Sequence, residues 1–450
     1  MKKISAIIAI AMLLTACNLV PEFKRPDVET PAQWHDAVPA EQQSAVDPQW
    51  WRAFGSAELD RLIAEALAYN NDLAAARQRV EQARAQAKIA GANLWPTAGL
   101  QGDFSDSHND YGDTQKKSGQ FSVAYEVDLW GANRARRDAG SARLLGTVFA
   151  RDALQLVVMS NVGQAYFNLL AFVERKRIAT EFLGNVAEVL AVVEARYQAG
   201  AVSALDVAQQ RTELAAARAS LDLQTQQVIL AENALAILLG HPPQAVPFNA
   251  EHFFDIVMPT INAQQPASLL ERRPDVRQAE MELIAANADI GVARAAFYPK
   301  LQLNLDALLA SPQPAGVALA MASSLAQPLF QGGRLEGGLE NAEARNAELV
   351  ELYRKTILTA FKEVEDAAAV RSNSSRRLQA LAEAVAQARL AYQLSLDRYR
   401  LGAIDYQTLL TTQRSLLAAE TSQVQALQDV LVAMVQLYQA LGGGWSGGQP

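Results

Sequence analysis

The chain has few of the residues that build disulfide frameworks, metal centres and nucleic-acid surfaces. A single cysteine among 450 residues excludes an internal disulfide. The four histidines are scattered, so the sequence predicts no metal site; they are His35, His108, His241 and His252. Forty basic residues against 48 acidic ones give a net charge of −8, a poor balance for binding nucleic acid. We expect neither an enzyme nor a cofactor.

Aromatic residues are also scarce, at 7% of the chain, whereas apolar residues make up 50%. Alanine and glutamine are abundant in their place. This composition predicts a shallow and repetitive buried surface rather than one bulky core, and it argues against the two or three separate domains that the length alone would suggest.

The first residues form a short targeting segment. Lys2 and Lys3 precede an apolar run over 4–14 that is too short to span a bilayer as a stable helix. The run ends at Ala16-Cys17, which predicts a lipoprotein signal peptide over 1–16 and a lipidated Cys17, with palmitate among its acyl chains. The alternative is an ordinary secretory signal that happens to carry a cysteine. An asparagine, Asn18, rather than an aspartate follows the cysteine, which resembles the sequence of Gram-negative lipoproteins that stay in the outer membrane. Residues 17–57 are then predicted to form a lipid-anchored arm.

The rest of the chain is an internal two-fold repeat. The segments 72–96 and 275–299 each run from an aspartate to a proline with the same spacing. Arg196-Tyr197-x-x-Gly200 is echoed by Arg398-Tyr399-x-x-Gly402. The sequence therefore predicts structural repeats over 58–240 and 268–442, an equatorial linker over 241–267 and a flexible tail over 443–450.

Each repeat carries the same predicted order of elements, namely helix, two strands, long helix, glycine turn and helix. The predicted helices cover 58–94, 133–199, 203–239, 268–297, 333–401 and 403–441. The long ones would extend about 100 Å at 1.5 Å per residue. Two short helices placed end to end equal one long helix, as the uniform wall of a cylinder requires.

Four segments alternate between apolar and polar residues, at 98–105, 121–129, 301–306 and 317–329. Strands of this length with one apolar face are typical of outer-membrane β-barrels, although soluble hairpins packed on a core are the alternative. Four strands cannot close a cylinder alone, so the pattern predicts an oligomer. The acids expected to face the lumen and tune cation preference are Asp103, Glu126, Asp128 and Asp306.

Several motifs resemble one known family. These are the segment from Leu269 to Glu280, the segment from Ala293 to Pro299, the segment from Tyr125 to Gly131, and Arg398-Tyr399-x-x-Gly402. From Cys17 to about Gly443 the chain is similar to the outer-membrane efflux lipoproteins of the NodT-type branch of the TolC/OprM superfamily. The resemblance implies a mainly α fold with a β membrane part. It also implies a homotrimeric α-barrel/β-barrel channel of twelve strands, and docking to a periplasmic adaptor (membrane fusion) protein and an inner-membrane pump, commonly of the RND type.

The glycine turns are then the periplasmic tips of the channel. The residues predicted to contact the adaptor are Arg196, Gly200, Ser203, Arg398 and Gly402. Asp405, repeated around an axis, could form an acidic ring, with Arg398, Tyr399, Tyr406 and Arg414 as latch partners. The alternative is that Asp405, like Ser203 with Asp206, only caps the helix that follows.

These observations predict a passive exit duct for drugs or other small toxic compounds. It would lie in the Gram-negative outer membrane, be lipid-anchored and extend into the periplasm. Two alternatives stay open. One is the outer-membrane outlet of a type I protein secretion system, and the other is a lipid-anchored coiled-coil scaffold without a pore.

Overall fold

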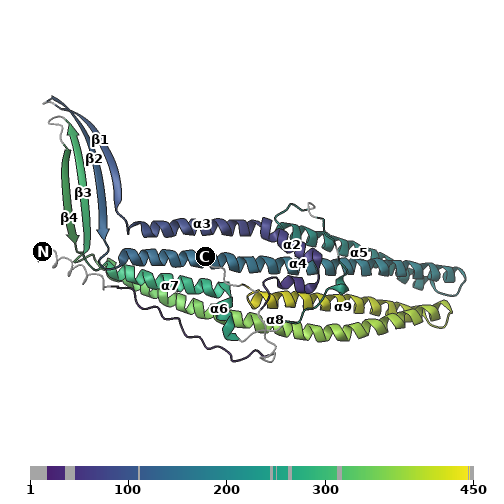
Figure 1. The fold of residues 1–450 in the computed structure, drawn as a ribbon. Helices are drawn as coiled ribbons and strands as arrows, with labels where there is room; N and C mark the ends of the chain where they lie inside the picture. The colour runs from purple at the N-terminus through teal and green to yellow at the C-terminus, as the bar shows by residue number, and fades with distance from the viewer. Residues whose placement is uncertain are drawn as a thin grey trace.

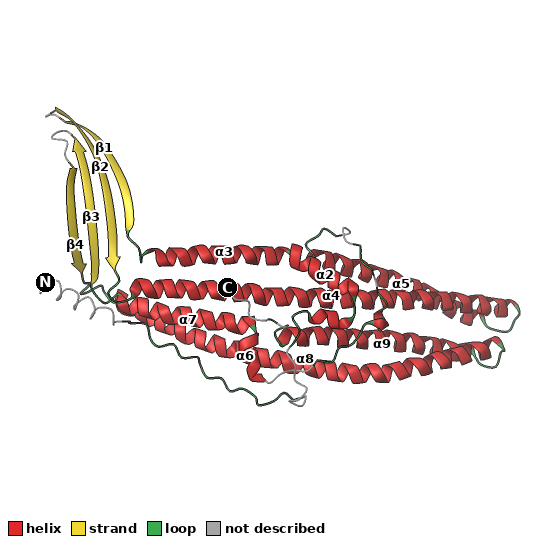
Figure 2. Ribbon diagram, viewed as in Figure 1, coloured by secondary structure: helices red, strands yellow, loops and turns green. Residues whose placement is uncertain are grey.

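A computed structural model describes residues 18–35, 46–109, 112–243, 247–249, 251–261, 266–311, 317–443 and 445. A sheet of four strands stands at one end of a long bundle of helices, and two helical hairpins form the opposite end (Figure 1; Figure 2). The molecule is therefore elongated, with its strands and its hairpin turns at opposite ends.

The two repeats contain the same elements in the same order, which confirms the predicted architecture. The first comprises α2 (Ala57–Tyr69), α3 (Asn71–Ala92), β1 (Thr97–Asn109), β2 (Gly112–Val127), α4 (Ala132–Gln198) and α5 (Ala204–Leu238). The second comprises α6 (Leu269–Arg272), α7 (Pro274–Ala295), β3 (Lys300–Ser311), β4 (Val317–Ala326), α8 (Arg334–Arg400) and α9 (Tyr406–Ala440). Among the described residues, three 3₁₀ turns lie outside these elements, at η3 (Trp50–Phe54), η4 (Phe253–Asp255) and η5 (Pro266–Ser268).

The first helix of each repeat is broken, where the sequence pattern predicts one continuous helix. In the first repeat Asn70 accepts the N–H of Leu73 at 3.0 Å and donates from Nδ2 to the carbonyl of Leu238 at 2.8 Å. In the second repeat Arg273 precedes the proline that starts α7, and its Nη1 donates to the carbonyl of Ala440 at 3.1 Å. Each break thus binds the end of the last helix of its own repeat. A one-residue break leaves the apolar periodicity almost unchanged, which is why the pattern does not reveal it.

A glycine completes each of these junctions. Gly240 has φ of 77°, and a Cβ added to it would lie 2.2 Å from the carbonyl oxygen of Tyr69. Gly442 has φ of 88°, and its added Cβ would lie 2.6 Å from the carbonyl oxygen of Arg272. Only glycine permits this conformation and this closeness together.

The largest core lies around these junctions, in the equatorial region where α2, α6 and the ends of α5 and α9 meet. Phe54, Leu62, Phe167 and Leu235 are fully buried there. One described helix, α4, is long and apolar enough to cross a membrane by length and composition, but 56% of its apolar window is buried inside the molecule. We interpret this stretch as a core helix.

The N-terminal arm follows the outside of α7 and α8 (Figure 1). Asn287 donates to the carbonyl of Pro21 at 2.8 Å, and Arg25 pairs with the buried Glu280 at 2.6 Å. A Cβ on Gly291 would lie 2.4 Å from the Val20 side chain, so the arm lies directly against α7. Its first described residue, Asn18, lies beside Gly131 at the junction of strands and helices.

Candidate functional site

The four strands form one antiparallel sheet in the order β1-β2-β3-β4. Residues opposed in the register point to the same face, and Leu100, Phe121 and Leu319 lie in one such row. The apolar face also carries Phe104, Val123, Tyr125, Leu303, Leu305, Met321 and Leu325. The opposite face is polar apart from Leu308 and several small residues. The sheet is therefore two-faced across all four strands.

Three of the four predicted lumen acids lie on the polar face. Asp306 accepts a hydrogen bond from Gln120 of β2 at 3.0 Å, and Asp103 accepts one from Gln101 at 3.3 Å. Glu126 opposes Gln302 in the register. The acids thus come from three different strands and share one face, as the alternation predicts.

Asp128 is placed differently from the predicted position. The pattern extends its strand to Leu129, whereas β2 ends at Val127. The carboxylate of Asp128 accepts the N–H groups of Asn133 and Arg134, at 3.0 and 2.9 Å. It satisfies the free donors at the start of α4, and this local role ends the strand.

The other strand limits also differ from the predictions. The strands extend beyond the alternating segments 98–105, 121–129 and 301–306, because β1 runs to Asn109, β2 begins at Gly112 and β3 runs to Ser311. The link residues 110–111 and 312–316 lie outside the described residues. β4 ends at Ala326, before Pro328, which has no N–H to donate to a ladder.

Aromatic side chains gather where the strands meet the helices. The indole of Trp130 donates to the carbonyl of Pro299 at 2.8 Å and lies over Tyr298, with ring centroids 4.6 Å apart. Trp95, just before β1, is 74% exposed, and Phe330, just after β4, is 89% exposed. Aromatic residues at this level are typical of a membrane–water interface. Cys17, the predicted lipidation site, lies outside the described residues, but its neighbour Asn18 lies at this same level.

The hairpin turns at the opposite end have identical backbone geometry. Gly200 and Gly402 have φ of 74° and 76°. In each turn the glycine N–H and the next N–H bond back to the last turn of the helix, as in a Schellman motif. Ser203 and Asp206 form a reciprocal capping box, and Asp405 caps α9 by accepting the N–H of Thr408 at 2.7 Å. The glycine turns and the caps at Ser203 and Asp405 are present as predicted.

The two hairpins pack against each other at these tips. Arg196 of α4 lies 4.7 Å over the ring of Tyr399 of α8 and donates from Nη1 to the Tyr399 carbonyl at 2.6 Å. Tyr406 of α9 donates to Gln210 of α5 at 2.6 Å. The rings of Tyr399 and Tyr406 meet edge to face, and their centroids are 6.4 Å apart. A small apolar cluster surrounds them, formed by Val189, Val193, Val207, Tyr392, Leu409 and Leu410.

Two ion pairs also join the hairpins. Arg414 of α9 binds the carboxylate of Glu213 of α5, and Arg400 of α8 binds Glu188 of α4. Glu213 and Glu188 are residues that the sequence reasoning missed. Glu213 carries a weak sequence signal, because a leucine and three alanines follow it directly on its helix. Arg414 thus pairs with Glu213 rather than with Asp405.

Burial changes the titration of the tip tyrosines. Burial, with the nearby Glu213 carboxylate, raises the pKa of Tyr406 to about 12. Burial raises the pKa of Tyr399, although the positive charge of Arg196 partly lowers it. Both hydroxyls therefore stay protonated at physiological pH. The pKa of Asp405 is lowered by its hydrogen bonds to Thr408, so this carboxylate stays charged.

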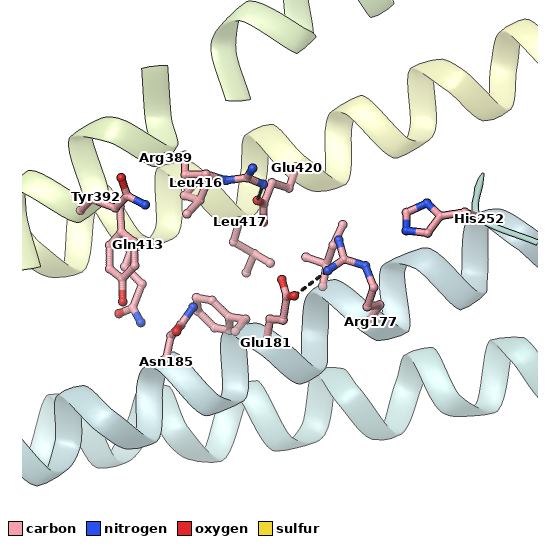
Figure 3. A pocket seen from close by; sticks show the side chains of 13 residues that line it. Arg177, Glu181, Asn185, His252, Arg389, Tyr392, Gln413, Leu416, Leu417 and Glu420 are labelled. Carbon is pink, nitrogen blue, oxygen red and sulfur yellow. Dashed lines mark hydrogen bonds and ion pairs between the residues drawn. The ribbon is translucent and has the colours of Figure 1, made fainter. Parts of the chain in front are cut away.

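A polar cavity of about 520 Å³ separates the tip contacts from the equatorial core (Figure 3). Arg177 pairs with Glu181 across one turn of α4, and Arg389 of α8 pairs with Glu420 of α9, both at 2.6 Å. Gln413 is 2% exposed, and neither of its amide atoms has a partner among the described residues. The hairpins therefore meet at two separate contact regions with a hollow between them.

The described residues contain no cluster of three or more histidine, cysteine or acidic side chains able to hold a metal ion. The long helices, the two-faced sheet and the paired tips instead make a structural wall. Of the candidate gate residues, Tyr399, Tyr406 and Arg414 lie at the contact between hairpins, and Asp405 lies in a cap beside it.

Known proteins of this architecture are similar over nearly the whole chain. The pyoverdine export outer membrane protein OpmQ of Pseudomonas putida is 38% identical, over 99% of this chain and 98% of its own. The cation efflux system protein CusC of Escherichia coli K12 is 31% identical, over 97% and 98%. Among solved structures, the outer-membrane channel OprN has a TM-score of 0.88 at 26% identity, with 95% and 100% coverage. The open MtrE channel of Neisseria gonorrhoeae has a TM-score of 0.85 at 28% identity, with 95% and 99% coverage.

Two blocks of the chain, residues 62–241 and 266–443, match a single family description. Together they span most of the described sheet, helices and tips. The chain belongs to the outer membrane efflux protein family, and it is an efflux channel of the outer membrane that extends into the periplasm.

Proposed function

We propose that three copies of this chain form a passive exit duct in the outer membrane, fed by a periplasmic adaptor and an inner-membrane pump of the RND type. The pump supplies the energy, and the duct performs no chemistry. The observation that carries the proposal is the two-faced sheet, because a periplasmic scaffold has no use for an apolar outer face.

The sheet has two open edges. β1 pairs only with β2, and β4 pairs only with β3, among the described strands. In lipid, each unpaired backbone group costs several kcal/mol, so the edges must meet those of other copies. Three copies give twelve strands, enough to enclose a water-filled lumen. The polar faces with Asp103, Glu126 and Asp306 would then line this lumen and favour cations.

Two substitutions on one strand test the assignment of the faces. Met321 of β4 is 88% exposed on the apolar face, whereas Ser324 of the same strand lies on the polar face. Met321→Lys places a charge in lipid at a cost of about 2–4 kcal/mol near the midplane, and we expect loss of insertion. Ser324→Lys should insert and reduce cation selectivity in planar-bilayer recordings. Normal insertion of Met321→Lys would contradict the duct.

The arm supports a lipid anchor at the membrane surface. Asn18 lies at the level of Trp130 and Tyr298, so an acyl group on the preceding cysteine would reach the inner leaflet directly. We therefore propose that Cys17 is lipidated. Mass spectrometry of the mature N-terminus tests this, and an unmodified residue 17 would contradict it.

The tips are the proposed adaptor contacts. Nothing lies within 4 Å of a Cβ added to Gly200, so this turn is open. Leu205 and Leu401, at the ends of the two hairpins, are 64% and 84% exposed. Apolar side chains gathered at an otherwise open end indicate a docking surface.

Leu401→Glu should abolish export in cells while purified channels keep their conductance in bilayers. Equal loss of both activities would mean that the substitution damages the duct itself and does not act on docking.

Small compounds are the proposed cargo. The relatives include a pyoverdine export protein, a cation efflux protein and a toluene efflux pump protein, none of which is named for a protein substrate. Deletion of the gene should therefore raise cellular accumulation of a small toxic compound. Loss of a secreted protein with no change in small-molecule accumulation would favour the type I secretion outlet instead.

A further inference from the structure

The two hairpin tips carry the same dipeptide in different surroundings. Tyr399 is 1% exposed, whereas its repeat counterpart Tyr197 is 48% exposed. The Arg196 side chain is bound to the other hairpin. Its counterpart Arg398 is exposed, and its guanidinium has no hydrogen bond or ion pair to a described residue. The first hairpin therefore uses its arginine, and the second its tyrosine, in the contact within the chain. The remaining Tyr197 and Arg398 are exposed.

The contact between Arg196 and Tyr399 shows how the arginine and the tyrosine of the motif bind each other. The guanidinium of Arg196 lies over the Tyr399 ring and also binds the Tyr399 carbonyl, which already accepts the N–H of Gly402 at 2.9 Å. The Tyr197 carbonyl accepts the N–H of Gly200 at 2.9 Å in the same way, and its ring is open. Tyr197 thus presents the same acceptor and the same ring without their arginine.

The flank that carries Arg398 is itself apolar. Leu390 and Leu394 are each 50% exposed and lie four and eight residues before Arg398, on one face of α8. Exposed leucines in line with an arginine whose guanidinium has no partner in the described part of the chain indicate a packing surface rather than a solvated one. In a closed ring of copies, this flank of the second hairpin meets the flank of the first hairpin of the next copy.

We propose that Arg398 of one copy stacks on Tyr197 of the next copy and binds its carbonyl, which repeats between chains the Arg196–Tyr399 contact within each chain. The periplasmic end is then closed by six arginine–tyrosine stacks that alternate within and between copies. This inference rests on the proposed assembly of three copies. A second copy of the chain is its only partner, and the adaptor has no part in it.

Cross-linking of the purified full-length channel tests the pairing. The variant Tyr197→Cys/Arg398→Cys, treated with a short bismaleimide without adaptor, should give covalent dimers and trimers on denaturing gels. The matched variant Arg196→Cys/Tyr399→Cys should cross-link within one chain and stay at monomer mass. Each single-cysteine variant, with Cys17 present, controls for other cross-links.

The outcomes separate the inference from the proposed function. A trimer by native mass spectrometry that gives no cross-link between copies, or gives one only with adaptor added, overturns the inference and leaves the duct intact. A chain that is monomeric in detergent overturns the proposed function as well.

The chemistry of the stack has its own test, because Tyr197→Phe keeps the ring and Tyr197→Leu does not. We expect Tyr197→Leu and Arg398→Gln to raise the resting conductance about threefold, a change that corresponds to the loss of a weak cation–π contact. Tyr197→Phe should stay near the wild-type value. Equal effects of Phe and Leu would overturn the stack.

Discussion

The two helical hairpins share the Arg-Tyr-x-x-Gly motif and the same turn geometry, yet they differ in what surrounds them. The α4–α5 turn and the α8–α9 turn both close with a glycine near φ of 75° and the same backbone bonds. Tyr399 is nevertheless buried and Tyr197 is half exposed. Local sequence therefore determines the turn, and the neighbouring hairpin determines which side chain of the motif is used.

A second comparison separates the equatorial glycines from the tip glycines. Gly240 and Gly442 have carbonyl oxygens within 3 Å of an added Cβ, whereas Gly200 has nothing within 4 Å. All three have positive φ. The equatorial region is thus closely packed around its glycines, whereas the turn at Gly200 is open.

The largest expected effect comes from the equatorial glycines. Gly240→Ala should destabilise the fold by roughly 3–5 kcal/mol, since it combines strained backbone with a clash against the Tyr69 carbonyl. Gly200→Ala should cost about 1–2 kcal/mol, from the backbone strain alone. Thermal dissociation of the purified channel measures both. Similar losses in the two variants would mean that the clash at Gly240 is relieved by a small movement.

The next effect concerns the paired tyrosines. Tyr399→Ala empties a buried site at the tip and should cost about 3 kcal/mol, whereas Tyr197→Ala should cost about 1 kcal/mol. We expect Tyr399→Ala to give the higher resting conductance in planar bilayers. If Tyr197→Ala opens the channel as far as Tyr399→Ala, the contacts between copies are as strong as those within the chain.

The ion pairs give a smaller contrast. Arg414→Ala leaves the Glu213 carboxylate, which is 9% exposed, without its partner, and we expect a loss of about 2 kcal/mol. Arg211→Ala removes an exposed pair with Glu194 within the first hairpin and should cost about 0.5 kcal/mol.

Double-mutant cycles with Glu213→Gln and Glu194→Gln measure the two couplings. Equal coupling energies would show that the contact between hairpins at Arg414 is no more protected from water than a surface pair.

The smallest effect is a dependence on pH at Asp405. Its pKa is lowered from the ordinary 3.8, so the cap contributes stability above that value and loses it as the pH falls through the lowered pKa. The wild-type α8–α9 turn should become more sensitive to an acid-active protease as the pH falls below 3.8. Asp405→Asn keeps the acceptor oxygen and should remove this dependence, and an unchanged profile in that variant would assign the effect to other groups.

Much of the architecture could be predicted from the sequence, because it depends on periodicity and repetition. The alternation in 121–129 and 301–306 predicts a two-faced sheet, and the long uninterrupted helical patterns predict α4 and α8 to within a residue or two. The strand ends were less predictable. The alternation predicts that Asp128 belongs to a strand, but its carboxylate instead accepts the free N–H groups at the start of α4.

The break at Arg273 has a local signal, since Pro274 with Asp275 is a standard helix start. The break at Asn70 could not be predicted, because it is defined by a contact with a helix end 168 residues away along the chain. The same limit applies to Glu213, whose partner Arg414 lies 201 residues further on. Sequence spacing carries no information on which of many acids and arginines will face each other across two hairpins.

By itself the sequence determined the repeat, the two faces of the strands, the positive-φ glycines and the caps, since all of these follow from neighbours within a few residues. Only the tertiary structure decided which arginine lies on which tyrosine, which acid pairs with Arg414, and that the first helix of the first repeat breaks at Asn70. Those features depend on free energies of contact between segments distant in the chain, and identical motifs acquire different roles when one is covered by a neighbour and the other is not.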